Sequence, residues 1–184
     1  AKQFSFAFCA AEFNEILTQD TDAIMVTTRH DTHASSVVAA INANKHVYVE
    51  KPIALTVEEL MQIQHAKLAT NIESNTSQVM VGFNRRFAPS TQDVIAHFSG
   101  VKTPLVVNIR VNSGNIPADH WIQDVKTGGG RVIGEGCHFV DLASALVGSN
   151  PKTVTAIGTA KANKSAVLND NVVISLTFEN GSVA

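Results

Sequence analysis

Three residues that lie close together in the sequence have side chains that bind metal ions. His30, Asp31 and His33 directly follow a short apolar segment that is typical of a buried strand. Histidine and aspartate are common ligands of catalytic zinc, and His138 and Asp141 further along the chain could complete such a site. One interpretation of the sequence is therefore a metal-dependent hydrolase.

A lysine and a histidine offer acid–base chemistry instead. Lys51 follows a predicted strand that ends at Glu50, at the carboxyl edge of a sheet, where open α/β sheets bind ligands. A cationic lysine there can hydrogen-bond a reacting oxygen and stabilise the negative charge that develops on it. His138 follows a run of glycines. An unperturbed imidazole has a pKa near neutrality, which suits a general acid or base. The alternatives without a functional role are a solvated loop lysine for Lys51 and a hydrogen-bonded core histidine for His138.

The first half of the chain predicts a parallel sheet that positions Lys51. Residues 22–28, 46–50 and 78–82 are short apolar segments typical of strands, and the first two have the composition of strands buried on both faces. Two predicted helices separate the three strands. Alternating strands and helices with short links are typical of a parallel sheet wound by right-handed crossovers.

Local signals mark the ends of these two helices. Asp31 or Thr32 is the predicted N-cap of the first helix, and Asn44 ends it in a left-handed turn. Thr56 and Glu59 form a capping box at the start of the second. The residues predicted to face the core are Ala34, Val37, Val38 and Ile41 in the first helix and Val57, Leu60, Met61 and Leu68 in the second.

The second half predicts a different arrangement. After a helix at about 90–98, the partly alternating segment 104–112 predicts a strand with one covered face. The glycines at 128–130 precede a helix that ends at Gly148, and they are predicted to allow a close backbone approach. Two further strands are predicted at 152–158 and 171–178. The core stripe of the helix is Phe139, Leu142, Ala143 and Leu146.

Composition excludes several classes of protein. The 14 basic residues nearly balance the 16 acidic ones, so we expect neither nucleic-acid nor membrane-surface binding. Cys9 and Cys137 are far apart, which is typical of a reducing compartment, and we expect a cytoplasmic protein. No apolar run approaches the roughly 18 residues of a membrane span.

Four motifs follow one another along the chain, at residues 27–33, 44–52, 81–89 and 128–141. Together they resemble the Gfo/Idh/MocA oxidoreductases, a family named for glucose-fructose oxidoreductase, inositol dehydrogenase and a rhizopine-catabolism protein. Residues 27–33 resemble its Thr-Pro-Asn-x-x-His turn, and residues 44–52 its Gly-Lys-His-Val…Glu-Lys-Pro signature. Residues 81–89 and the glycine segment 128–141, with Trp121 before it, match two more. Each motif alone is weak, but four in the same order are specific.

The resemblance implies an α/β fold of two parts. A Rossmann domain that binds NAD or NADP, here residues 1–88, precedes an α/β substrate domain, here residues 89–184. The second domain has a mostly antiparallel open sheet, which implies a homo-oligomer formed through that sheet. The implied reaction is hydride transfer between the cofactor and a hydroxyl of a sugar, polyol or sugar derivative, without a metal.

The resemblance also implies roles for individual residues. Lys51 and His138 are the implied catalytic residues, and Glu135 is a candidate to orient His138. Implied cofactor contacts are Thr27, Thr28, Arg29, His33, Glu50, Lys51, Asn84 and Arg86. Implied substrate contacts are Lys51, Arg110, His120, Trp121 and His138.

Two features depart from the family pattern. The glycine-rich phosphate turn Gly-x-Gly-x-x-Gly is absent from the 184 residues, and only 21 residues precede Asp22, too few for a βαβ unit of roughly 30 residues. With three residues after the predicted Asn180–Gly181 turn, we expect a chain truncated at both ends. In addition, Gly134 stands where many members have an aspartate four residues before the histidine.

The dehydrogenase interpretation ranks above two alternatives. A metal hydrolase would leave the Glu50–Pro52 segment without a role and lacks further spaced ligands. A third class is a noncatalytic module, in which residues 100–184 act only in oligomerisation. Metal analysis would test the first alternative, and the intact mass compared with the open reading frame would test the second.

Overall fold

Three parallel strands form the sheet that the first half of the sequence predicts. A computed structural model of the chain describes residues 5–71, 77–159 and 171–184. Strands β1 (Ala23–Val26), β2 (His46–Val49) and β3 (Val79–Val81) are hydrogen-bonded in the order β1-β2-β3. Ile24 is opposite Val47, and Val47 is opposite Val79. The predicted strands and their parallel pairing are confirmed.

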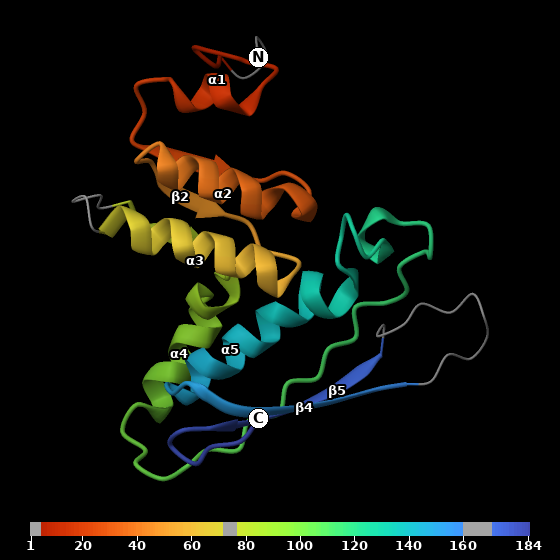
Figure 1. Cartoon of the computed structure of the whole chain (residues 1–184). Helices are drawn as coiled ribbons and strands as arrows, with labels where there is room; N and C mark the ends of the chain where they lie inside the picture. Colours follow the sequence, from red (N-terminus) through yellow and green to blue (C-terminus); the bar gives the residue numbers. More distant parts are fainter. Residues whose placement is uncertain (1–4, 72–76, 160–170) are drawn as a thin grey trace. The chain divides into compact units, whose positions relative to one another are not determined.

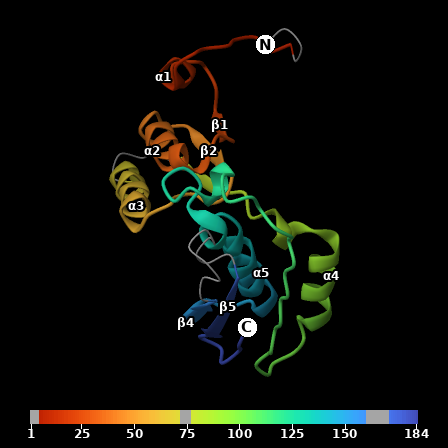
Figure 2. The same ribbon diagram turned by 90° about the vertical axis from the view of Figure 1, so that its right-hand side faces the viewer.

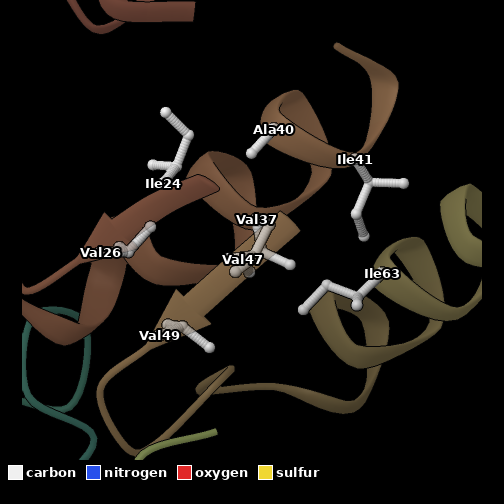
Figure 3. Packing of buried hydrophobic residues seen from close by; sticks show 9 residues of the cluster. Ile24, Val26, Val37, Ala40, Ile41, Val47, Val49 and Ile63 are labelled. Atoms are coloured by element: carbon white, nitrogen blue, oxygen red, sulfur yellow. The ribbon is translucent and has the colours of Figure 1, made fainter. Parts of the chain in front are cut away.

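Two helices cover one face of this sheet (Figure 1). Helices α2 (His33–Asn42) and α3 (Val57–Asn71) connect the strands, and the short helix α1 (Phe13–Leu17) precedes them. Asn44 has φ +58°, and Thr56 and Glu59 exchange capping hydrogen bonds, as predicted. Figure 3 shows strand side chains pointing toward the two helices; the labelled core residues are Ile24, Val26, Val37, Ala40, Ile41, Val47, Val49 and Ile63.

Two predictions about burial in this region are wrong. The side chains of Val57, Leu60, Met61 and Leu68 are exposed, and α3 faces the core with Ile63 and Ala66 instead. A helix with apolar residues on two sides does not reveal from its spacing which side is covered. Strand β1 is buried on one face only, since Met25 on the opposite face is 69% exposed. The continuous apolar run therefore overstated its burial.

The chain divides into two compact units, residues 1–82 and 83–184, a few residues before the predicted boundary after 88. The second unit begins with the 3-10 helix η3 (Asn84–Phe87) and helix α4 (Pro89–Phe98). After the 3-10 helix η4 (Trp121–Gln123), the π-helix η5 (Val132–Gly136) leads directly into helix α5 (Cys137–Val147). Gly148 ends α5 with φ +67°, as predicted.

Helix α5 packs against an antiparallel pair of strands. The two predicted strands are present as β4 (Pro151–Gly158) and β5 (Val172–Phe178), which pair antiparallel (Figure 2). They carry the second core. Its buried members are Ala143, Val147, Leu176 and Phe178. Beyond β5, the backbones of Leu176 and Ala184 exchange hydrogen bonds of 2.8 and 3.0 Å, so the chain turns back at 180–181 as predicted.

Two predictions about this unit need correction. Residues 104–112 are not one of the β-strands, although their burial partly alternates. A parallel bridge joins Val106 to Val183. Alternation predicts the covered face of an extended segment, but it does not provide a hydrogen-bonding neighbour. Of the predicted α5 stripe, only Ala143 belongs to the core, which α5 enters through Val140, Ala143 and Val147. The π-helix was not predicted.

Candidate functional site

The carboxyl ends of β1 and β2 lie beside each other. The backbone N–H of Glu50 donates to the carbonyl of Val26 at 2.9 Å, so the residues that follow the two strands leave the sheet as neighbours. Thr27, Thr28 and Arg29 after β1 are exposed, and Glu50 and Lys51 after β2 are half-buried. The Lys51–Pro52 peptide bond is cis. The five residues predicted to contact a cofactor here therefore share one edge of the sheet, where such sheets bind ligands.

His33, also predicted to contact the cofactor, holds this edge together from inside. Its side chain is 0% exposed. Nδ1 lies 2.8 Å from the carbonyl oxygen of Pro52, and Nε2 lies 3.0 Å from that of Thr28. The imidazole thereby bridges the loop after β1 and the loop that contains Lys51. In this structure its polar atoms face the backbone of these two loops.

A tyrosine and a glycine that the sequence did not single out complete the same edge. The Tyr48 hydroxyl donates to Oε1 of Glu50 at 3.3 Å. Desolvation, followed by the negative charge of Glu50 and this hydrogen bond, raises the pKa of Tyr48. A Cβ at Gly82, directly after β3, would lie 2.7 Å from that hydroxyl. Gly82 therefore allows the tyrosine to lie across the end of the neighbouring strand.

His138 occupies the first turn of α5 and is 6% exposed. The ring of Phe83 meets it edge-on, with ring centroids 6.1 Å apart and planes at 71°. Glu135, the predicted orienter, lies in the π-helix, is half-buried and lines a cavity of about 840 Å³ between α5 and the two antiparallel strands. The cavity walls are mainly apolar, with Arg131 and Asn112 among the polar residues.

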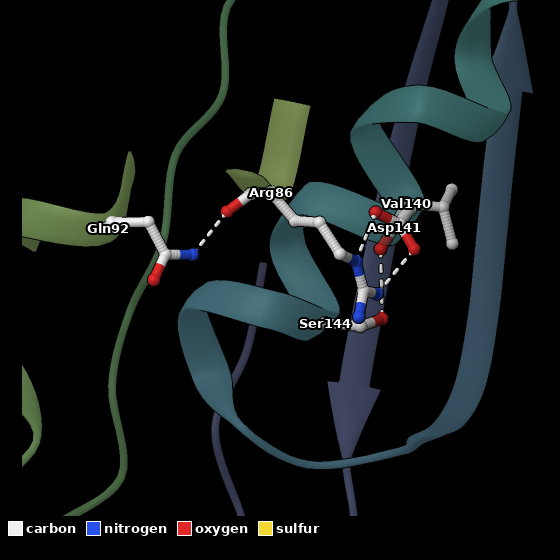
Figure 4. A network of polar contacts seen from close by, with 5 residues as sticks. All are labelled: Arg86, Gln92, Val140, Asp141 and Ser144. Atoms are coloured by element: carbon white, nitrogen blue, oxygen red, sulfur yellow. Dashed lines mark hydrogen bonds and ion pairs between the residues drawn. The ribbon is translucent and has the colours of Figure 1, made fainter. Parts of the chain in front are cut away.

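The residues before α4 divide into exposed and engaged side chains. Asn84 is exposed. Arg86 forms a two-pronged ion pair with Asp141 of α5: Nε donates to Oδ2 at 2.9 Å and Nη2 donates to Oδ1 (Figure 4). This hydrogen bonding, opposed by partial desolvation and aided by the charge of Asp141, raises the pKa of Arg86. The sequence did not indicate this ion pair. Asp141 lies one helical turn after His138.

The candidate substrate residues lie before the glycine segment. Nδ1 of His120 accepts a hydrogen bond from the backbone of Ile122 at 3.3 Å, and its ring lies 5.8 Å from that of Trp121. Arg110 is exposed on the extended segment 104–112.

Gly128 confirms the predicted close approach of two backbones. A Cβ there would lie 2.4 Å from Cα of Ile122 and 2.6 Å from the carbonyl oxygens of Trp121 and Ile122. Asp124 organises the turn, because its carbonyl accepts from Gly128 and Gly129 at 2.8 and 3.0 Å. Its carboxylate accepts from the backbones of Lys126 and Thr127, which lowers the pKa of Asp124. No sequence motif indicated a role for Asp124.

The described residues do not form the metal site that the hydrolase interpretation requires. Within residues 5–71, 77–159 and 171–184, no group of three His, Cys, Asp or Glu side chains is arranged to hold a metal ion. His33 directs both ring nitrogens toward backbone carbonyls, and Asp141 pairs with Arg86.

In the same described part of the chain, no helix has both the length and the apolar character needed to cross a membrane.

A parallel sheet whose strands are connected by helices, followed by a unit with an antiparallel strand pair, is the arrangement of a Rossmann-type α/β protein. Residues 1–83 match the oxidoreductase family with an NAD-binding Rossmann fold, and residues 103–184 match the GFO/IDH/MocA C-terminal domain. The chain belongs to the Gfo/Idh/MocA family, as its four motifs predicted.

Several relatives extend this assignment. The uncharacterised oxidoreductase YrbE of Bacillus subtilis is 31% identical over 195 residues, which cover 100% of this chain and 53% of that protein. An inositol 2-dehydrogenase of Rhizobium meliloti is 30% identical over 147 residues, covering 79% of this chain and 42% of the relative. The chain spans about half the length of the curated relatives it matches.

Solved structures share the fold. A putative myo-inositol dehydrogenase from Sinorhizobium meliloti aligns with a TM-score of 0.71 and 26% identity, over 93% of this chain and 52% of that one. Levoglucosan dehydrogenase in complex with NADH and levoglucosan aligns with a TM-score of 0.78 over 100% of this chain and 52% of that one. At 23% identity, the second likeness shows the fold alone.

Proposed function

We propose that this chain contributes the catalytic residues of an NAD(P)-dependent oxidoreductase that acts on a hydroxyl of a sugar, polyol or sugar derivative. The observation that carries the proposal is Lys51, placed directly after β2 at the carboxyl edge of a parallel sheet. The names of the relatives, which include inositol and levoglucosan dehydrogenases, support this substrate class.

The cofactor contacts proposed in residues 1–88 lie where a dinucleotide meets an open sheet. Thr27, Thr28 and Arg29 present exposed polar groups after β1, and the half-buried Glu50 and Lys51 follow the neighbouring strand. This polar, partly open edge fits the nicotinamide end of NAD or NADP. Asn84 and Arg86 remain proposed contacts from the second unit, although the Arg86 guanidinium already binds Asp141.

Two residues carry the proposed proton and charge chemistry. When bound, the nicotinamide ring accepts or donates the hydride. His138 takes the hydroxyl proton in oxidation and returns it in reduction, because an imidazole titrates near neutrality. Lys51 donates a hydrogen bond to the substrate oxygen and stabilises its developing negative charge. Glu135, three residues before His138, is the proposed orienter of that imidazole.

The proposed domain 89–184, which lies within the second unit, supplies the proposed substrate and partner contacts. His120 and Trp121 offer a polar edge and an apolar face, a combination that suits a sugar ring, and Arg110 offers hydrogen-bond donors. The face of β4 and β5 that includes Ile157 and Val173 is exposed, and we propose that a second copy of the protein packs on it. Cys9 and Cys137 lie far apart in the sequence, and this sparse cysteine usage supports the proposed cytoplasmic location.

Two substitutions test the catalytic assignment. His138→Asn keeps much of the shape but removes a base of near-neutral pKa, so we expect turnover to fall by about 100-fold or more. Lys51→Met keeps the stem and deletes the charge, so turnover should fall more than substrate affinity. The measurement is the pH dependence of NAD- or NADP-linked oxidation across a panel of sugars and polyols.

The pH profiles separate the two roles. The acidic limb should flatten in His138→Asn and persist at a lower rate in Lys51→Met. Near-normal rates in both variants would refute the site assignment. A parent protein that oxidises no member of the panel would instead favour the noncatalytic alternative.

A further inference from the structure

Residues 83–86 lie along the first turn of α5 and contact it in register. The contacts pair three side chains of this segment with three of the helix: Phe83 with His138, Arg85 with Phe139, and Arg86 with Asp141. The first is an edge-on ring contact, the second places the Arg85 guanidinium carbon 4.7 Å from the ring centroid, and the third is an ion pair. All six residues belong to the second unit.

The ion pair is the strongest of these contacts. The guanidinium donates through two nitrogens to the two oxygens of one carboxylate, a geometry that fixes direction as well as distance. The side chain of Asp141 is only 10% exposed, whereas that of Arg86 is 39% exposed. The Arg86 backbone is held in turn, because Nε2 of Gln92 donates to its carbonyl at 2.5 Å. Asp141 therefore pairs with an arginine whose backbone carbonyl is hydrogen-bonded to a side chain of α4.

A π-helix directly precedes α5. Residues 132–136 have the wider π hydrogen-bonding pattern, and α5 begins at the next residue. A π-turn inserts an extra residue and turns the following helix face relative to the preceding one. His138 is the second residue after that change, so its direction depends on contacts outside the helix. Asp141 is three residues further on, hence on the same face.

We propose that Arg86 and Asp141 are a positioning pair for His138. The pair fixes the rotation of the first turn of α5, and Phe83 then meets the imidazole ring at a defined angle. This inference rests on the proposed function for its catalytic consequence. Neither member of the pair is assigned a proton-transfer step.

The test compares Asp141→Asn, which keeps the side-chain shape and removes the charge, with Asp141→Glu, which keeps the charge. Arg86→Gln and the double variant Arg86→Gln/Asp141→Asn complete a double-mutant cycle. Arg85→Gln is the matched control, since it removes a neighbouring cation that contacts Phe139. The first readout is the NMR signal of the His138 ring and its nuclear Overhauser contact with Phe83, which requires no substrate.

We expect Asp141→Asn and Arg86→Gln each to shift the His138 ring signals and weaken the Phe83 contact. Turnover should fall about 10- to 100-fold, with a much smaller change in KM, because misplacing a catalytic group chiefly affects the chemical step. The double variant should be little worse than either single one, and Asp141→Glu should recover part of the rate. The control should change turnover less than about threefold.

The two levels of the inference fail separately. Unchanged His138 signals and rates in Asp141→Asn would overturn the positioning role, even if the variant unfolds at a lower temperature. If the parent oxidises no sugar or polyol, the proposed function fails. The ring signals of the variants still decide whether the pair orients His138.

Discussion

The two candidate site regions are held in place by different means. At the sheet edge of the first unit, buried His33 reaches the backbone carbonyls of two loops. At the start of α5, by contrast, Arg86 and Asp141 meet through their side chains. A backbone carbonyl is present whatever residue occupies the loop, whereas an ion pair requires both partners. The first arrangement thus depends on one residue type, and the second depends on two.

The His33 imidazole faces two backbone acceptors. A neutral imidazole has one N–H, so it can donate to only one of the two carbonyls, of Thr28 and Pro52. The imidazolium donates to both but is costly to bury. The ring of His30 lies beside that of His33, with centroids 5.6 Å apart. Backbone acceptors therefore set the hydrogen bonding of His33, whereas opposite charges set that of Arg86.

The largest expected effect is the loss of the His33 bridge. His33→Ala leaves two carbonyls facing a cavity, and because an unsatisfied buried polar group costs about 1–3 kcal/mol, we expect a loss of about 3 kcal/mol or more in the free energy of unfolding. Urea denaturation measures it. His65→Ala, on the exposed side of α3, is the control and should stay within about 0.5 kcal/mol. Equal effects of the two changes would show that the bridge contributes nothing.

Substitutions at two glycines test whether the stability of the second unit depends on a close backbone approach. Gly128→Ala places a Cβ 2.4 Å from Cα of Ile122, so two backbone segments must separate, and we expect a loss of about 2 kcal/mol. Gly100→Ala is the control, since a Cβ there meets nothing within 4 Å. Thermal unfolding of both variants measures the difference. A Gly128→Ala protein as stable as Gly100→Ala would refute the close approach.

The same contrast explains what the sequence could predict. The parallel strands were predictable because each is a short apolar run between a cap and a turn, and these signals are local. Lys51 followed from the end of the second strand, whereas Thr27 was indicated by the family resemblance. The covered side of α3 was not predictable, because exposed Leu60 and buried Ile63 are both apolar and only tertiary packing distinguishes them.

In the second unit, several features depend on distant partners. The segment 104–112 alternates like a strand, but Val183 forms only a bridge with it. No periodicity identifies the π-helix or pairs Arg86 with Asp141, which are 55 residues apart. His138 and Gly128 were predictable from motifs and residue type, whereas the contacts that orient them were not.

The smallest expected effect tests whether charge also matters at the first unit's sheet edge. Tyr48 is the single tyrosine of the chain, so the absorbance of tyrosinate reports its titration alone. Desolvation, the charge of Glu50 and their hydrogen bond raise its pKa above 10.0, and Glu50→Gln should lower it part of the way back, because desolvation remains. Since the folded-state pKa is raised, this contribution to stability is present below pH 10 and is lost as the pH rises through the folded-state value. Glu58→Gln, on α3, is the charge-matched control. A Tyr48 midpoint that Glu50→Gln and Glu58→Gln leave equally unchanged would mean that Glu50 does not act on the hydroxyl.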